Sequence, residues 1–139
     1  ADIDAVVEPV LDVVVFNMTN QLSEGSYGAA LMTLQKLLKM QEEPIYILGA
    51  IGSHFRRLGV AKTLLDNGKQ ANDLMKLCGL TSYPAQKTMD AARRFRPEFC
   101  RKAAELVLET DRNMKTSFDD QDRLLELLIL QLAQEARRG

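Results

Sequence analysis

The chain has 139 residues, a length typical of one domain. Hydrophobic residues make up 46% and charged residues 27%, which indicates a globular chain that buries a core and argues against disorder. The 18 Lys and Arg residues and the 19 Asp and Glu residues give a net charge of -1, which excludes a strongly basic nucleic-acid binder at the level of the whole chain.

The rare residue types exclude several kinds of site. His54 is the single histidine, so a metal site with several histidine ligands is excluded. Cys78 and Cys100 lie 22 residues apart without a pairing motif, which argues against a disulfide scaffold or a zinc site and fits a reducing, cytoplasmic setting. No apolar run reaches the roughly 18 residues that indicate a membrane span. We expect no cofactor, no metal and no membrane contact.

The start of the chain combines two segments. Residues 1–9 are predicted to form a short helix that Pro9 ends, as if a preceding element of a longer protein finished there. The β-branched run Val13–Val15 alone favours a strand, but the spacing of the apolar residues that follow favours a helix over about residues 14–24. Gly25 can then serve as its C-cap.

The rest of the chain shows helical periodicity without any hairpin or alternating pattern. Helices are predicted over about residues 27–40, 45–67, 71–77, 83–95, 97–116 and 119–136. Pro44 and Pro97 suit the first positions of two of them. Three glycines interrupt the long middle helix at about 1 kcal/mol each, which suggests close packing or a bend: Gly49, Gly52 and Gly59. The predicted fold is all-α, a single bundle of about six helices.

The last predicted helix is rich in leucine on nearly all of its circumference. A surface helix would show one apolar stripe, so most sides of this helix should be buried. It is either the central helix of the bundle or a helix that faces a partner chain. Both alternatives can be true if one face of the helix packs in the core and another face contacts the partner. The residues expected to form this core or assembly helix are Leu124, Leu125, Leu128 and Leu132.

No catalytic constellation is evident. A nucleophile would need His54 as its base, yet Ser53 and Phe55 are adjacent in sequence and do not face it on a helix. His54 is therefore expected to be an ordinary helix-surface or half-buried histidine. Phosphate-binding glycine motifs are missing. The acidic pairs Glu42/Glu43 and Asp119/Asp120 stand at predicted helix starts, where capping and the helix dipole explain them. We expect no enzyme activity in this chain and no small-molecule substrate.

Two basic clusters are candidate partner contacts. Residues 86–102 carry six positive and two negative side chains, a local charge of +4. A second cluster lies on the long middle helix. The structural interpretation of these clusters is a solvated helix face, and the functional interpretation is a contact for phosphates or for an acidic partner. The candidate contact residues are Arg56, Arg57, Arg93, Arg94 and Arg96.

Residues 71–95 also imitate a helix-turn-helix, which provides the alternative function of DNA binding. In that interpretation Gln86 and Lys87 would lie near the start of the recognition helix. The imitation is weak, because Met75 stands where the first helix usually carries a small residue.

The chain resembles the C-terminal part of the delta subunit of bacterial DNA polymerase III, a clamp-loader protein. The matching stretches occur in order along nearly the whole chain: SEGSYGAALMTLQKLL, QEEPIYILGAI, HFRRL, LCGLTSYPAQKTMDAARRF, LVLETDRNMKTS and LLELLILQL. Their order and spacing together carry the resemblance, since none is diagnostic alone. Gly52, Gly59 and Val13–Val15 depart slightly from the family pattern.

The resemblance implies a position in a larger protein. Family members have an AAA+-like module that does not hydrolyse ATP, then a lid domain, then a helical collar domain. Residues 1–9 would be the end of the last lid helix and residues 10–139 the collar, which is the oligomerisation domain. The implied partners are the other clamp-loader subunits, with DNA contacted only indirectly through the complex. The family's clamp-contacting residues would lie outside this chain. Asp111 and Lys115 match a family pair, interpreted here as structural.

Overall fold

The structure is a computed structural model that describes residues 13–22, 24–118 and 120–137. All regular structure in these residues is helical, so the predicted all-α class is confirmed. Helical residues 13–22 come first, which gives one helical segment more than the expected bundle of about six. The helices that follow are α2 (Tyr27–Lys39), α3 (Pro44–Asp66), α4 (Ala71–Cys78), α5 (Ser82–Arg94), α6 (Pro97–Thr116) and α7 (Gln121–Arg137).

Local sequence signals set several helix ends. Pro44 and Pro97 are the first residues of α3 and α6, where a missing N–H costs nothing. Gly79 ends α4 with φ +67°, a left-handed conformation that glycine adopts without a steric penalty. Before α7, the Asp120 carboxylate accepts a hydrogen bond from the Asp122 N–H at 3.0 Å. The predicted end segment, residues 1–9, lies outside the described residues.

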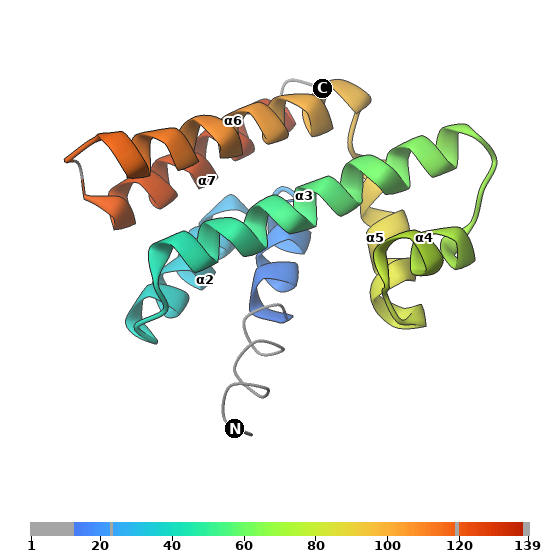
Figure 1. Cartoon of the computed structure of the whole chain (residues 1–139), viewed down its shortest axis with the longest axis horizontal. Helices are drawn as coiled ribbons and strands as arrows, with labels where there is room; N and C mark the ends of the chain where they lie inside the picture. The colour runs from blue at the N-terminus through green and yellow to red at the C-terminus, as the bar shows by residue number, and fades with distance from the viewer. Residues whose placement is uncertain (1–12, 23, 119, 138–139) are drawn as a thin grey trace.

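The long helix α3 occupies the centre of the molecule (Figure 1). It contacts α4, α5, α6 and α7, whereas α7 contacts α2, α3 and α6. The helices α6 and α7 lie side by side over the first part of α3, and the short pair α4 and α5 packs at its other end. Of the two alternatives for the leucine-rich last helix, the central position therefore belongs to α3, and the alternative of a helix that faces a partner chain stays open.

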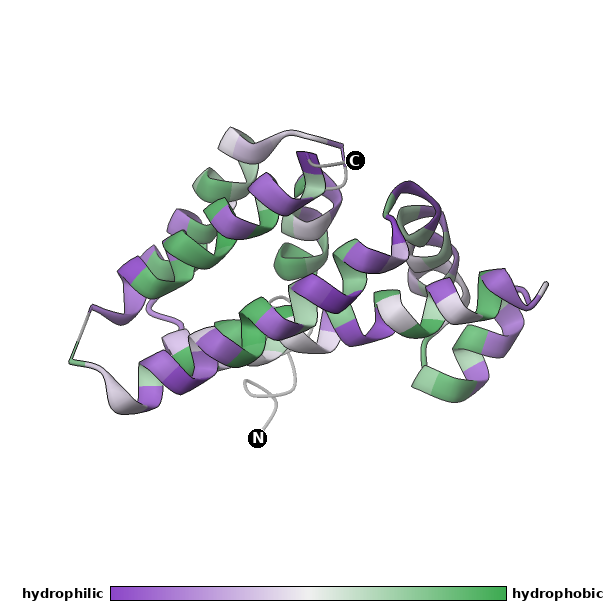
Figure 2. Ribbon diagram, turned by 90° about the horizontal axis from the view of Figure 1, so that it is seen from above, coloured by the Kyte–Doolittle hydropathy of each residue, from purple (hydrophilic) through white to green (hydrophobic). Residues whose placement is uncertain are grey.

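The core is continuous beneath these helices. Figure 2 shows apolar and polar residues interspersed along each helix, as expected for helices that bury one face. An aromatic cluster joins three elements: the Phe95 ring stacks on Phe99 with centroids 4.2 Å apart, and Phe55 meets Phe99 edge-on at 5.9 Å. Among the described residues, no helix has both the length and the apolar character that crossing a membrane requires.

One of the three α3 glycines is explained by packing. A Cβ at Gly52 would lie 3.2 Å from Cγ1 of Val107 on α6, so glycine at this position lets the two helices approach. A Cβ at Gly49 or Gly59 would meet nothing within 4 Å. Close packing, one of the two predicted explanations, is therefore correct for Gly52 and does not apply to the other two, for which a bend was the alternative.

Candidate partner-contact surfaces

The arginines at the end of α5 form the first candidate surface. Arg93 and Arg94 are both exposed. The Arg93 guanidinium forms an ion pair with Asp90 at 2.7 Å, and that of Arg94 lies 4.0 Å from the Glu24 carboxylate. Exposed pairs of this kind contribute little to stability, at most about 1 kcal/mol each. Exchange of either of these two ion pairs for a pair with a partner's carboxylate would therefore cost little.

Arg96 behaves differently from its two neighbours. It is half-buried in the link between α5 and α6, and its Nη2 donates a hydrogen bond to the Glu135 carbonyl near the end of α7, at 3.4 Å. A cation at a helix C-terminus is favoured by the helix dipole. The adjacent Phe95 is buried against Phe99. Arg96 therefore serves the fold, whereas its neighbours Arg93 and Arg94 present their charge outward.

The two arginines of α3 point in different directions and line different hollows. Arg56 is exposed, donates to the Ser53 hydroxyl at 3.0 Å and lines a groove between α3 and α6. Arg57 is half-buried and lines a different hollow, of about 610 Å³, shared with Tyr83 and Lys87 of α5. Successive helix positions point about 100° apart, which separates the two side chains. The five candidate arginines therefore do not form one patch.

The leucines of α7 divide into two groups. The four named from sequence are all buried: Leu124, Leu125, Leu128 and Leu132. Two others are exposed, Leu127 at 47% and Leu130 at 51%. Within this chain α7 packs on α2, α3 and α6, and these contacts leave Leu127 and Leu130 uncovered, so the expected burial of most of its sides would need a partner chain. A stripe of exposed leucine is left on the outer side of α7.

His54 also departs from the expectation of a helix-surface or half-buried residue. Its side chain is buried, 3% exposed, with the Phe16 ring edge-on at a centroid distance of 5.2 Å. Burial, followed by the positive charge of Arg57, lowers the pKa of His54 to about 4. No described residue reaches its Nε2 with a hydrogen bond. His54 is thus a neutral core residue at physiological pH.

The described residues contain no cluster of three or more His, Cys, Asp or Glu side chains able to hold a metal ion. Cys78 is half-buried and Cys100 is buried, and neither forms a disulfide. Burial raises the pKa of the Cys100 thiol, with the charge of Lys62 opposing the shift. A thiol of this kind is a poor nucleophile.

The two helices and the turn expected for the helix-turn-helix alternative are present, but their packing does not favour DNA binding. The helices α4 and α5 contact each other across the turn at Gly79, and Gln86 and Lys87 are exposed on α5. Met75 is half-buried against the core. However, α5 packs its other side on α3, as helices do in many bundles.

The α3–α6 groove was not anticipated from the sequence. It is an open hollow of about 440 Å³ whose lining includes Leu48, Phe55 and Val107 as its apolar floor. Leu108, beside Val107 in the sequence of α6, also lines the groove and is 61% exposed. The glycine content of α3 was the available signal, although it does not separate Gly49, which lines the groove, from Gly59, which does not.

Comparison with known proteins gives consistent results. The family model described as DNA polymerase III delta subunit, C-terminal domain, matches residues 12–132. The DNA polymerase III subunit delta of Bacillus subtilis (strain 168) is 30% identical over 131 residues, which are 94% of this chain and 38% of that protein. The solved structure of the Bacillus subtilis DNA clamp loader delta protein (YqeN) is similar with a TM-score of 0.83 and 30% identity, over 89% of this chain and 37% of that chain.

Proposed function

The chain belongs to the family formed by the C-terminal domains of DNA polymerase III delta subunits, and from this premise we propose that it is a protein–protein assembly module of a bacterial clamp loader. The observation that carries the proposal is the family match over residues 12–132, with a similar fold in a clamp-loader delta protein. The chain spans well under half the length of these relatives. Its role therefore concerns one part of the subunit's work in DNA replication.

Within that proposal, residues 10–139 form the collar domain and residues 1–9 end the preceding lid helix. The collar would hold the subunit beside the other clamp-loader subunits, while DNA is contacted through the complex. The burial of His54, the single histidine of the chain, supports a role that does not depend on a histidine base. The fold offers outward features for contact instead, namely the exposed arginines and leucines.

The arginine corner, which we define as Arg93 and Arg94, is one proposed contact. Both side chains are exposed, and arginine suits interfaces because its planar fork can pair a carboxylate in two places. Their present partners Asp90 and Glu24 are exposed as well, so these pairs can be exchanged. We expect a neighbouring subunit to offer an acidic surface there.

Co-purification of the full-length subunit with the other clamp-loader subunits tests the proposal. Deletion of residues 10–139 should abolish co-purification. The double variant Arg93→Glu, Arg94→Glu should weaken it, whereas Lys36→Glu, Lys39→Glu on α2 makes the same charge change elsewhere and should not. Unimpaired assembly of the deletion variant would overturn the proposal.

Tight binding of duplex DNA by the isolated chain at about 0.15 M salt, with a steep salt dependence, would favour the DNA-binding alternative.

A further inference from the structure

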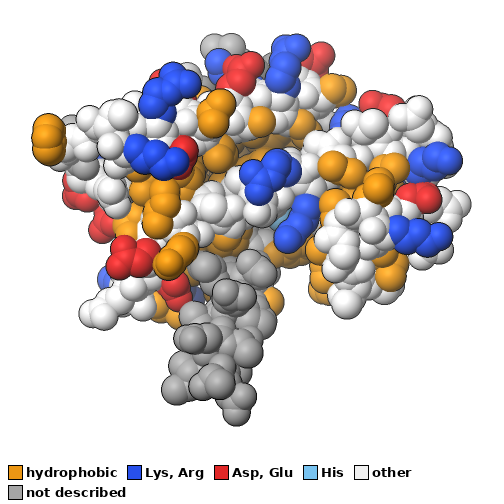
Figure 3. All heavy atoms as spheres, in the orientation of Figure 1, with side chains coloured by type: hydrophobic (Ala, Val, Ile, Leu, Met, Phe, Trp, Pro, Cys, Tyr) orange, Lys and Arg blue, Asp and Glu red, His pale blue; other side chains and the backbone are white. Residues whose placement is uncertain are grey.

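The α3–α6 groove, lined by Ile45, Leu48 and Gly49 of α3 and by Val107 and Leu108 of α6, is apolar and open. Figure 3 shows orange side chains gathered between α6 and α3, with charged side chains over them. Ile45 is 40% exposed and Leu108 is 61% exposed. Apolar surface of this kind, rimmed by charge, is typical of a site that another protein covers.

Gly49 keeps the groove open. It lies in the interior of α3, where glycine destabilises the helix by about 1 kcal/mol relative to alanine. A Cβ at this position would meet nothing within 4 Å, so the fold of this chain does not require glycine there. Gly52 is different, because Val107 would contact its Cβ. A larger side chain at Gly49 would project into the groove and fill it.

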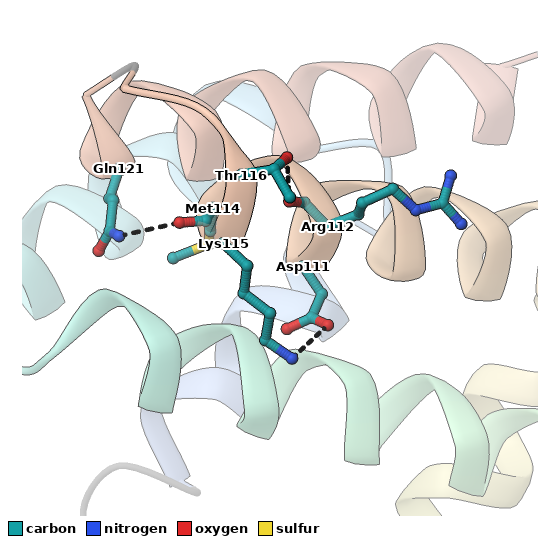
Figure 4. Close-up of polar contacts among 6 residues, drawn as sticks. All are labelled: Asp111, Arg112, Met114, Lys115, Thr116 and Gln121. Carbon is teal, nitrogen blue, oxygen red and sulfur yellow. Dashed lines mark hydrogen bonds and ion pairs between the residues drawn. The ribbon is translucent and has the colours of Figure 1, made fainter.

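Charge at the groove is positive on balance. Figure 4 shows Asp111 and Lys115 extending from α6 toward α3, with their ion pair at 3.0 Å. Arg56 lines the groove from α3 and forms no ion pair with any described carboxylate. Two cations and one anion leave a charge of +1 over an apolar floor. The complementary occupant has an apolar face bordered by a carboxylate.

We infer that the α3–α6 groove binds an amphipathic helix of a neighbouring clamp-loader subunit, with large apolar side chains entering beside Gly49 and a carboxylate meeting Arg56. This inference rests on the function proposed above and specifies a contact for it. A groove between two helices receives the apolar face of a third helix through side chains spaced at i, i+3 and i+4. The described residues contain no strand whose edge could bind an extended segment instead.

Other occupants fit the groove less well. Two copies of this chain meeting by the same surface would bring two cations each, Arg56 and Lys115, against one carboxylate each, Asp111, which Lys115 already pairs. A nucleic-acid backbone would gain from the cations but not from the apolar floor, since phosphate contacts come from polar and basic groups. The mixture of an apolar floor and a positive rim favours a protein helix with acidic residues.

A matched pair of glycine variants in the full-length subunit tests the inference. Gly49→Leu fills the groove, whereas Gly59→Leu makes the same change in the same helix at a position outside it, also with nothing within 4 Å of the Cβ. Binding of each variant to the other clamp-loader subunits is measured by titration, with melting temperature as the folding check. Gly49→Leu should bind at least about tenfold more weakly than the parent, and Gly59→Leu should bind like it.

A charge pair gives the second measurement. Arg56→Glu should weaken binding, whereas Arg112→Glu makes the same charge change on α6 with a side chain that does not extend toward α3 (Figure 4). If the parent assembles and Gly49→Leu binds as tightly as Gly59→Leu, the inference is wrong while the proposed function stands. If the parent does not assemble at all, both fail. If Gly49→Leu instead abolishes a homodimer or DNA binding and leaves subunit assembly intact, the occupant is not a neighbouring subunit.

Discussion

The imidazole of His54 packs edge-on against the ring of Phe16, joining the middle of α3 to the helical segment of residues 13–22. The rings cross at 88° with centroids 5.2 Å apart. An edge-to-face arrangement of this kind is the geometry that aromatic pairs prefer. The neutral ring is accommodated in the core, and a protonated ring would be a buried cation beside Arg57.

The chain should therefore lose stability as the pH falls below about 6.5. Above that pH, His54 is neutral in both the folded and the unfolded chain. Between the unfolded value of 6.5 and the folded pKa of about 4, only the unfolded chain binds the proton, which favours unfolding. The full loss is about 3 kcal/mol. Urea unfolding at several pH values between about 7 and 4 measures it.

His54→Leu separates this effect from the protonation of carboxylates. The variant should show a shallower fall in the free energy of unfolding than the parent between about pH 6.5 and pH 4.5. Carboxylates titrate mainly at the lower end of this range and contribute equally to both proteins. Equal slopes for the two proteins would mean that His54 is protonated in the folded chain.

The ends of the helices could be predicted because their signals are local. Pro44 and Pro97 start α3 and α6 where the sequence placed them, and Gly79 ends α4. Each signal depends on backbone geometry within a few residues. The same reasoning misjudged the burial of His54, because Phe16 lies 38 residues earlier and nothing in the sequence near His54 reports the contact.

Exposed apolar residues were harder to anticipate. The leucine content of α7 predicted that the helix is buried on most sides. The neighbouring helices decide how many of its faces are covered within the chain, and the contacts with α2, α3 and α6 leave Leu127 and Leu130 exposed. Likewise, Val107 and Leu108 have similar apolar character, and only the position of α3 decides which of them forms the floor of the groove. Such surfaces depend on tertiary packing, which residue spacing does not specify.

Two leucines of α7 should respond oppositely to the same change. Leu128→Asp places a carboxylate without a partner in the core, where the leucine is fully buried, and should destabilise the chain by more than about 4 kcal/mol. Leu130→Asp changes a side chain that is 51% exposed and should cost less than about 1 kcal/mol. Thermal unfolding followed by circular dichroism compares them. An unchanged melting temperature for Leu128→Asp would place that residue outside the core.

Two glycines of α3 should likewise differ. Gly59→Ala should stabilise the chain by about 0.5–1 kcal/mol, because alanine favours helix and its Cβ meets nothing within 4 Å. Gly52→Ala should gain less or lose stability, because its Cβ would press on Cγ1 of Val107 at 3.2 Å. In the background of Val107→Ala, the Gly52→Ala change should become more favourable. Chemical denaturation of the parent, the two single variants and the Gly52→Ala, Val107→Ala double variant measures this coupling, and purely additive effects would contradict the contact.

Arg96 should contribute more to the stability of the fold than an exposed arginine does. Its hydrogen bond to the Glu135 carbonyl connects the α5–α6 link to the last turns of α7, so Arg96→Ala should destabilise the chain by about 1 kcal/mol. Arg101→Ala is the control, because Arg101 is exposed on the neighbouring α6, and its loss should cost less than about 0.5 kcal/mol. Urea denaturation distinguishes the two variants. Equal stability would mean that the bond to Glu135 contributes nothing and that Arg96 belongs with Arg93 and Arg94 as a surface residue, available to a partner.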